Sequence, residues 1–470
     1  MSKLISRWES VKPWVDSLPT WGDGPFEEFI KGAGVSKQFK SKILGGFVAA
    51  FLLASLVFSP LALAQRGGVA NSATRNAAIV AATDAVLKET SELRELAILR
   101  PVRSGAQSRA EIERMLIKNL NEQMTAAEMH ATEVSLRKFG LTSGDFEYRP
   151  FIIKLLAEQV AGYYDPRAQE FHLADWLELE GQKPVMAHEL THALQDQHFN
   201  LRRFEKWPPG DSDAELAAHS LIEGDATLTM TIYMAKNPLV ALAFARSLGS
   251  SGMSSEQFNQ APRALRESLV FPYLQGMEWT RQLYKRGGWN MVSEAFTRLP
   301  QSTEQILHPE KYFSYERPLK VVLPDLRNVL GPNWKRIDSD VNGEWSYYLI
   351  LDQFLNSPTE SRRAAAGWAG DRYALYEGPK LGQVFLEQIA AWDTENDARE
   401  FFDAYVKRTE LRYPGARPLA SATNANGQHQ RRAWQTSEGG VVVELRGMRV
   451  VIVEGVPEGV DPNSLIRALS

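Results

Sequence analysis

Two histidines and a glutamate within five residues carry the clearest chemical potential of this chain. His188, Glu189 and His192 form the pattern His-Glu-Leu-Thr-His. Residues four apart share a helix face, so both imidazoles could hold one metal ion. Glu189 would then lie beside that ion, where a general base for a metal-bound water belongs. The chain has only 8 histidines in 470 residues, so this pattern predicts a zinc site.

A catalytic zinc takes three protein ligands and leaves its fourth position to water, so one further ligand is needed. Glu223 is the leading candidate, in the apolar middle of a helix expected over residues 215–234. An unpaired carboxylate there would be costly, and a cation is therefore expected beside it. Gly224 would allow a second helix to approach closely, and we expect that helix to be the one with the histidines.

Other residues compete for the third position. His198 completes the histidine spacing of metzincins, but Gln195 stands where that pattern has a glycine that turns the backbone sharply. Asp213 and Glu215 are acidic alternatives at the start of the second helix. We expect Glu223 to complete a His-His-Glu set and keep the other three residues as alternatives.

The combined motifs resemble those of gluzincin-type zinc metallopeptidases. Residues 187–197, together with Glu223 in Glu-Gly-Asp-Ala, are similar to a group of little-characterised, exported bacterial metallopeptidases. Residues 302–312 look like a further element of the same group. The resemblance covers about residues 150–320.

The resemblance implies a peptidase with Zn²⁺ as cofactor and a peptide or protein as substrate. His188, His192 and Glu223 would hold the ion, and Glu189 would take a proton from the zinc-bound water and pass it to the leaving amine. An alternative from another functional class is a non-catalytic extracytoplasmic scaffold that keeps zinc for stability. A fourth ligand, either His198 or His219, would favour that alternative.

Two departures from the gluzincin pattern concern the helix that bears the acid. The 31 positions between His192 and Glu223 exceed the gap in compact members of the class. Thr227 stands where thermolysin-like enzymes have an acid four residues after the glutamate. The role of the neighbouring Asp225 is therefore left open.

The segment before the motif is a candidate for substrate binding. Residues 159–173 read as two short strands around an Asp-Pro turn. The edge of such a sheet can pair with an extended peptide, and a purely structural hairpin is the alternative. An oxyanion needs a donor besides the ion, and four side chains could provide it: Tyr163, Tyr164, His219 and Tyr233.

The apolar residues 43–64 indicate the cellular location of the protein. They carry no charge, follow three lysines and end in Ala-Leu-Ala, which is the layout of a secretory signal. The same stretch is just long enough for a membrane anchor. Either reading places the following residues outside the cytoplasm, as a secreted, periplasmic or membrane-anchored protein. Residues 1–42 would be a cytosolic tail or the result of a mis-called start.

Composition and periodicity predict an α+β fold. The net charge of −4, without a basic stripe, excludes nucleic-acid binding, and the absence of cysteine excludes disulfides. After a linker at 65–80, the resemblance implies a mainly helical, zincin-like core with a short sheet and a metallopeptidase domain over residues 65–325. Residues 326–470 read as a smaller α+β domain of unknown role. Residues 99–102 read as a strand and residues 367–370 as a loop.

Overall fold

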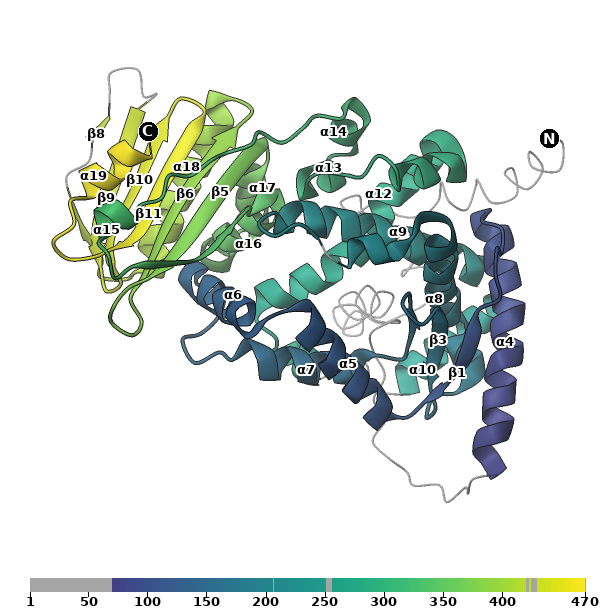
Figure 1. Cartoon of the computed structure of the whole chain (residues 1–470). Helices are drawn as coiled ribbons and strands as arrows, with labels where there is room; N and C mark the ends of the chain where they lie inside the picture. The colour runs from purple at the N-terminus through teal and green to yellow at the C-terminus, as the bar shows by residue number, and fades with distance from the viewer. Residues whose placement is uncertain (1–69, 206, 251–255, 420–421, 424–428, 470) are drawn as a thin grey trace, which may run out of the picture.

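The computed structural model describes residues 70–205, 207–250, 256–419, 422–423 and 429–469. These residues form an α+β fold, in which a helical region with a small sheet adjoins a larger sheet that has its own helices (Figure 1). The predicted α+β class is confirmed, and the zincin-like character of the helical core stays a prediction. The predicted tail and the signal or anchor segment lie outside the described residues.

Helices dominate the first part of the described chain. They are α4 (Ala70–Arg94), α5 (Arg109–Gln123), α6 (Ala126–Phe139), α7 (Tyr148–Gln159), α8 (Leu179–Phe199), α9 (Ser212–Lys236), α10 (Pro238–Ser250), α11 (Glu256–Gln260), α12 (Arg263–Ala295), α13 (Thr303–Leu307) and α14 (Pro309–Ser314), with a 3₁₀ turn at Leu201–Phe204. A three-stranded sheet lies among them, in the order β1-β3-β2. Its strands are β1 (Arg103–Gln107), β2 (Gly162–Asp165) and β3 (Glu170–Ala174). β1 runs parallel to β3 and β2 antiparallel to it, so β2 is an edge strand.

The second sheet has the order β4-β5-β6-β11-β10-β9-β7, and β8 also pairs with β9. Its strands are β4 (Lys335–Asp340), β5 (Trp368–Glu377), β6 (Val384–Trp392), β7 (Arg417–Pro418), β8 (Ala422–Thr423), β9 (His429–Thr436), β10 (Gly439–Arg446) and β11 (Arg449–Val456). Its helices are α15 (Arg327–Leu330), α16 (Gly343–Leu355), α17 (Pro358–Ala365), α18 (Glu395–Arg412) and α19 (Pro462–Ala468).

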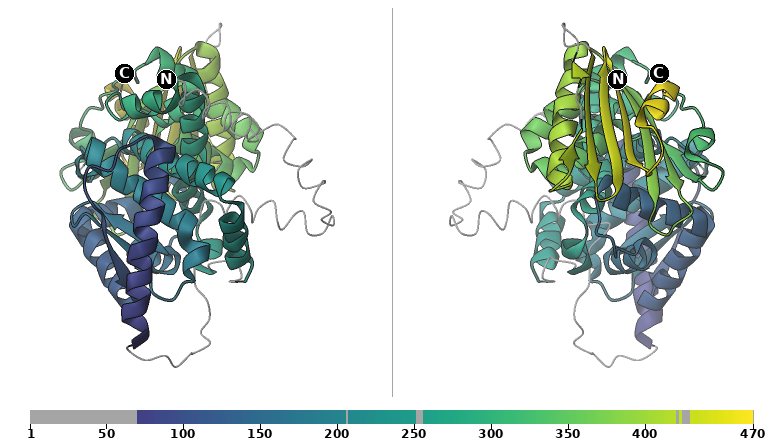
Figure 2. Two further views of the ribbon diagram at one scale, coloured as in Figure 1. Left: turned by 90° about the vertical axis from the view of Figure 1, so that its right-hand side faces the viewer. Right: turned by 90° about the vertical axis from the view of Figure 1, so that its left-hand side faces the viewer.

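The right-hand view of Figure 2 shows this sheet face-on. Its middle strands β6, β11 and β10 are buried on both faces almost throughout, which explains their near-continuous apolar sequence. Successive side chains of a strand point to opposite faces. Val443 accordingly belongs to the apolar cluster that includes Phe401 of α18. Its neighbour Val442 belongs to the cluster that includes Leu465 of α19 and Leu330 of α15. The larger of these clusters continues into the helical region, and the domain boundary after residue 325 stays a prediction.

Three local predictions were wrong. Part of the expected linker at 65–80 belongs to α4, because Ala-rich sequence favours a helix once one face packs against α8. Residues 99–102 are not a strand, and β1 begins one residue later. Most of the expected loop at 367–370 starts β5 instead. The glycine there serves a close approach, because a Cβ on Gly370 would lie 2.2 Å from the carbonyl oxygen of Leu319.

Within the ranges given above, no single helix is long and apolar enough to cross a bilayer, whereas α9 and α10 would meet the length and composition test only as a pair bent by 113°.

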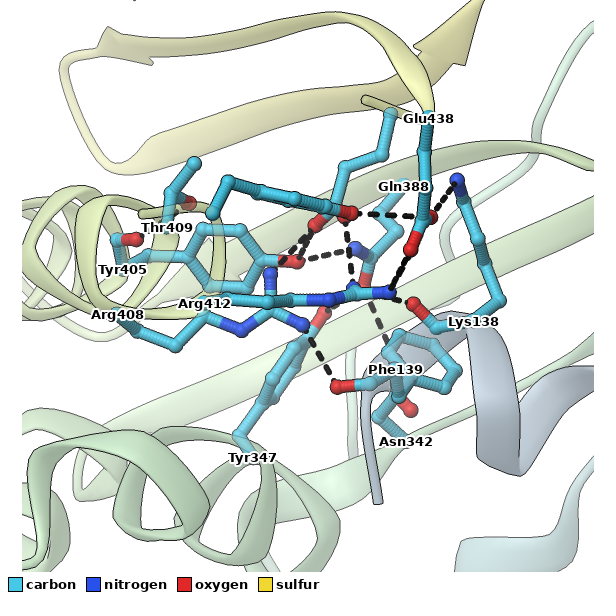
Figure 3. Close-up of polar contacts among 12 residues, drawn as sticks. Lys138, Phe139, Asn342, Tyr347, Gln388, Tyr405, Arg408, Thr409, Arg412 and Glu438 are labelled. Carbon is cyan, nitrogen blue, oxygen red and sulfur yellow. Dashed lines mark hydrogen bonds and ion pairs between the residues drawn. The ribbon is translucent and has the colours of Figure 1, made fainter. Parts of the chain in front are cut away.

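A buried ionic network joins α6 to the larger sheet (Figure 3). Arg408 of α18 donates to the carbonyl oxygen of Phe139 at 2.7 Å, and Arg412 donates to that of Lys138. Cationic side chains at the C-terminus of a helix are favourable, because the last carbonyls there lack partners. Glu454 of β11 lies between the two arginines, 2.8 Å from Arg408 Nη1 and 3.1 Å from Arg412 Nη1.

Replacing Glu454 should make the fold less stable and less sensitive to acid. Burial alone would raise the pKa of Glu454, but Arg408 and Arg412 outweigh it and lower the pKa to about 2. Because the unfolded pKa is about 4.3, the carboxylate stabilises the fold fully above that pH and loses this contribution as the pH falls towards 2. Glu454→Gln should lower the free energy of unfolding at pH 7 by about 3–5 kcal/mol.

Urea unfolding between pH 2 and 7 measures both effects. Part of the acid dependence of wild-type stability should vanish in Glu454→Gln. Glu458→Gln is the matched control, since Glu458 is exposed beyond the end of the same strand. An acid dependence identical to that of the wild type in Glu454→Gln would contradict the assignment.

Candidate metal centre

The two histidines of the motif lie on α8. This helix ends at Asn200, whose backbone is in the left-handed region with φ of 56°, which asparagine tolerates better than most residues. The turn that contains His188 and His192 is almost entirely enclosed by apolar neighbours. Four residues apart, the two imidazoles point to the same side of the helix, as the sequence predicts.

The acid comes from α9. The Asp211 side chain caps this helix by accepting a hydrogen bond of 3.1 Å from the Ala214 N–H. A Cβ on Gly224 would lie 2.2 Å from the backbone of Gly276 on α12. The close approach next to Glu223 therefore exists, but the prediction of its partner was wrong. The partner is α12, whereas α8 meets α9 through longer side chains.

Three ligand atoms converge between α8 and α9. His188 Nε2 lies 3.1 Å from Glu223 Oε2 and 3.1 Å from His192 Nε2, and the third side of this triangle measures 3.4 Å. These atoms could hold a metal ion. The side chain of Glu223 is 21% exposed and that of His188 only 1%, so the cluster opens to solvent on the side of α9. The three residues lie together as predicted, and their role as ligands stays a prediction.

The same convergence governs the protonation of the cluster. Burial alone would lower the pKa of His192, but the carboxylate of Glu223 outweighs burial and raises it to about 9. Burial would likewise raise the pKa of Glu223, yet the two imidazoles hold it well below its ordinary value. At neutral pH the ionised Glu223 therefore stabilises a positive charge on His192, and a metal ion bound at the same point would take the place of the proton on that imidazole.

Glu189 is buried beside this cluster and bound to β2. Its Oε2 accepts a hydrogen bond of 3.0 Å from the backbone N–H of Tyr164, whose phenol donates to Asp196 Oδ2 at 3.0 Å. Two bonds therefore fix the edge strand to α8. Burial raises the pKa of Glu189, against the opposing effect of the nearby imidazoles. A carboxylate with a raised pKa is better suited to accept and return a proton near neutral pH.

A chain of buried polar side chains supports His192. Its Nδ1 lies 2.9 Å from Gln195 Oε1, and Gln195 Nε2 donates to Ile222 O at 3.0 Å and to Asp225 Oδ2 at 2.9 Å. Arg94 of α4 pairs with the other oxygen of Asp225. This series of hydrogen bonds was not predicted from the sequence. The spacing of three between His192 and Gln195 places both on one helix face and was the available signal.

The alternative third ligands do not join the cluster. His198 is exposed at the end of α8, and its Nε2 lies 2.7 Å from the carbonyl oxygen of Ala97. Asp213 accepts hydrogen bonds from Thr303. Glu215 precedes Glu223 by eight residues, which is about 12 Å along a helix.

The four candidate oxyanion donors lie at different positions relative to the cluster. The phenols of Tyr163 and Tyr164 donate to side chains outside the cluster. Tyr233 is buried ten residues beyond Glu223, about 15 Å along the helix. His219 is exposed, one turn before Glu223 on the same helix. Of the four, His219 alone is both exposed and on the helix face of Glu223.

Tyr273 of α12 lies beside the cluster. Its ring stacks against that of His188, with centroids 6.0 Å apart and planes at 26°. The two residues are 85 positions apart in the chain, and no local pattern connects them. Only the packing of α12 against α9 brings them together.

Replacing the predicted third ligand should weaken metal binding selectively. Glu223→Ala removes one of three ligand atoms, and we expect at least a tenfold loss of zinc affinity, measured by competition with a chromophoric chelator. His198→Ala is the matched control and should bind zinc as the wild type does, because His198 faces Ala97. Loss of zinc affinity in His198→Ala, with affinity kept in Glu223→Ala, would instead assign the third ligand position to His198.

The comparisons with known proteins concern the other end of the chain. Residues 329–463 match a family described as a domain of unknown function (DUF8575). No curated protein and no solved structure matches the chain. The match covers the strands of the larger sheet together with α16, α17 and α18, and it does not include the residues of the metal centre.

Proposed function

We propose that the chain is a zinc-dependent peptidase of the gluzincin type. The observation that carries this proposal is the convergence of His188, His192 and Glu223 on one point, with the buried carboxylate of Glu189 next to them. The proposed substrate is a peptide or protein.

The spacing of the ligand atoms supports zinc as the ion. Ligand atoms about 2.05 Å from a tetrahedral zinc lie about 3.3 Å apart. The three separations here are 3.1, 3.1 and 3.4 Å. Two imidazole nitrogens and one carboxylate oxygen are also a donor set of catalytic zinc sites. Within the part of the chain that the structure describes, the cluster contains three such residues, which leaves a position for a fourth ligand.

Zinc and the residues next to its site would each supply one part of the hydrolysis. Zinc, when bound, would supply Lewis acidity towards water and towards a substrate carbonyl. Glu189 accepts the proton of the attacking water and then donates it to the nitrogen of the leaving amine. The backbone N–H of Tyr164 holds the carboxylate in position for both transfers.

The strand β2 would hold the substrate. It is the edge of its sheet and is fixed to α8 by Tyr164, next to Glu189. An extended peptide could add to such an edge by backbone pairing, which would bring its scissile bond beside α8. The hairpin predicted over residues 159–173 is present, although its first strand begins only at Gly162.

The proposed site of action is outside the cytoplasm. This part of the proposal depends on the apolar residues 43–64, which would be a cleaved signal or a membrane anchor. Fractionation of cells that produce the full chain, followed by N-terminal sequencing of the mature protein, distinguishes the two.

The test of the peptidase proposal combines metal content with turnover. The full chain should retain close to one zinc per molecule after dialysis and should cleave casein or a quenched peptide. A strong chelator should abolish cleavage, and added zinc should restore it. A chain that retains zinc but cleaves none of a broad peptide set would refute the peptidase proposal and would favour a zinc-stabilised scaffold.

A further inference from the structure

We propose that Gln195 is a positioning residue that decides which ring nitrogen of His192 faces the metal, an inference that rests on the proposed metal centre. Gln195 is fully buried on α8. It connects His192 to α9 and, through Asp225, to Arg94 of α4. It would act through His192 and not by touching the substrate.

The surroundings of Gln195 leave its amide one orientation. The Nε2 group lies 3.0 Å from the carbonyl oxygen of Ile222 and 2.9 Å from Asp225 Oδ2. A carbonyl oxygen and a carboxylate oxygen only accept hydrogen bonds, so the amide NH₂ must face both of them. The amide oxygen is thereby turned towards His192 Nδ1, at 2.9 Å.

This orientation determines the tautomer of His192. Because an amide oxygen can only accept, Nδ1 must carry the ring proton, and the lone pair of the neutral imidazole lies on Nε2. Nε2 is the atom that lies 3.1 Å from His188 Nε2. The hydrogen bond thus directs the free lone pair of His192 at the point shared by the three ligand atoms.

Arg94 ends this series of hydrogen-bonded side chains and holds Asp225 in place. It is fully buried and pairs through Nε with Asp225 Oδ1, while its Nη atoms lie 3.2 Å from Ser293 Oγ. The pairing holds the Asp225 carboxylate where it accepts the hydrogen bond from Gln195. A charge on a third helix therefore supports the orientation of one metal ligand on α8.

The other histidine is oriented differently, so the effect of Gln195 should be specific. His188 Nδ1 is buried and has no hydrogen-bond partner among the described residues. The ring of His188 stacks instead against Tyr273. Loss of the Gln195 acceptor should therefore loosen His192 alone.

The first test is zinc affinity. Gln195→Met keeps the length of the side chain and removes both hydrogen-bonding functions, and we expect its dissociation constant for zinc to rise about 10- to 100-fold. Gln197→Met is the matched control on the same helix, because the amide of Gln197 bonds only to the backbone of Leu99 and Arg100.

The second test separates positioning from a purely structural role. Either role would lower the melting temperature of the metal-free chain, but only positioning would change the visible spectrum of the Co²⁺-loaded chain in Gln195→Met. A Gln195→Met variant with wild-type zinc affinity and an unchanged Co²⁺ spectrum would overturn the inference and leave the peptidase proposal standing. A wild-type chain that binds zinc but cleaves no peptide would refute the peptidase proposal and leave the positioning role of Gln195 standing.

The third test needs no variant that might misfold. In the zinc-loaded full chain with ¹⁵N-labelled histidine, the His192 signals should show a protonated Nδ1 and a metal-bound Nε2. A metal-bound Nδ1 would overturn the inference.

Discussion

Glu189→Gln should keep the metal and lose nearly all peptide hydrolysis. The amide has the size of the carboxylate, and its oxygen can still accept the hydrogen bond from the Tyr164 N–H, so the packing around α8 should persist. It cannot accept a proton from water at neutral pH. General base catalysis contributes about 10²–10⁴-fold, and we expect kcat to fall by that factor. Quenched-peptide kinetics and metal analysis of the same preparation measure both quantities.

The matched control is Glu180→Gln in the first turn of α8. Glu180 is 60% exposed and pairs only with Lys183 at 2.8 Å, so this variant carries the same change of charge on the same helix away from the cluster. It should retain wild-type kinetics and zinc content. Hydrolysis by Glu189→Gln at the wild-type rate would remove Glu189 from the mechanism. Loss of zinc in that variant would instead assign Glu189 to the metal site itself.

The parts of the site that could be predicted depend on local geometry. The placement of His188 and His192 follows from helix periodicity, which is a property of five consecutive residues. Glu223 could be predicted from the cost of an unpaired carboxylate in an apolar helix, although 31 residues separate it from His192. In both cases a single physical requirement sufficed, and no knowledge of the surrounding packing was needed.

The supporting residues could not be predicted, because they depend on pairings between distant helices. Arg94 precedes Asp225 by 131 residues, and the two meet only once α4 packs against α8 and α9. No local pattern distinguishes Tyr273 until α12 places it beside His188. Gln195 appeared only as an argument against a glycine turn, although its amide connects two of the helices.

The larger sheet shows a similar division. Its central strands were predictable from runs of β-branched residues, such as 441–443. The start of β5 was not, because Gly370 resembles a loop residue until the backbone of Leu319 is seen against it. A glycine in isolation does not reveal whether it supplies a turn or a close approach.

Gly224→Ala should displace α9 from α12 and thereby disturb the metal centre. In an open helix this change would stabilise the chain by about 1 kcal/mol, because alanine is the better helix former. Here the new Cβ would lie 2.2 Å from the backbone carbonyl of Gly276. No side chain can move aside to relieve that contact. We therefore expect a net loss of about 1–3 kcal/mol, with the helices forced apart by about 1 Å.

The effect should reach zinc because Glu223 immediately precedes this glycine. Gly224→Ala should lower the midpoint of thermal unfolding and weaken zinc binding together, whereas Gly144→Ala should change neither, because a Cβ on Gly144 would meet no atom within 4 Å. Gly276→Ala approaches the same contact from α12, where its Cβ would lie 2.2 Å from the Ser220 carbonyl oxygen, and it should reproduce both losses. A stabilised Gly224→Ala variant with intact zinc affinity would mean that α9 and α12 do not touch at this point. The position of Glu223 would then need another explanation.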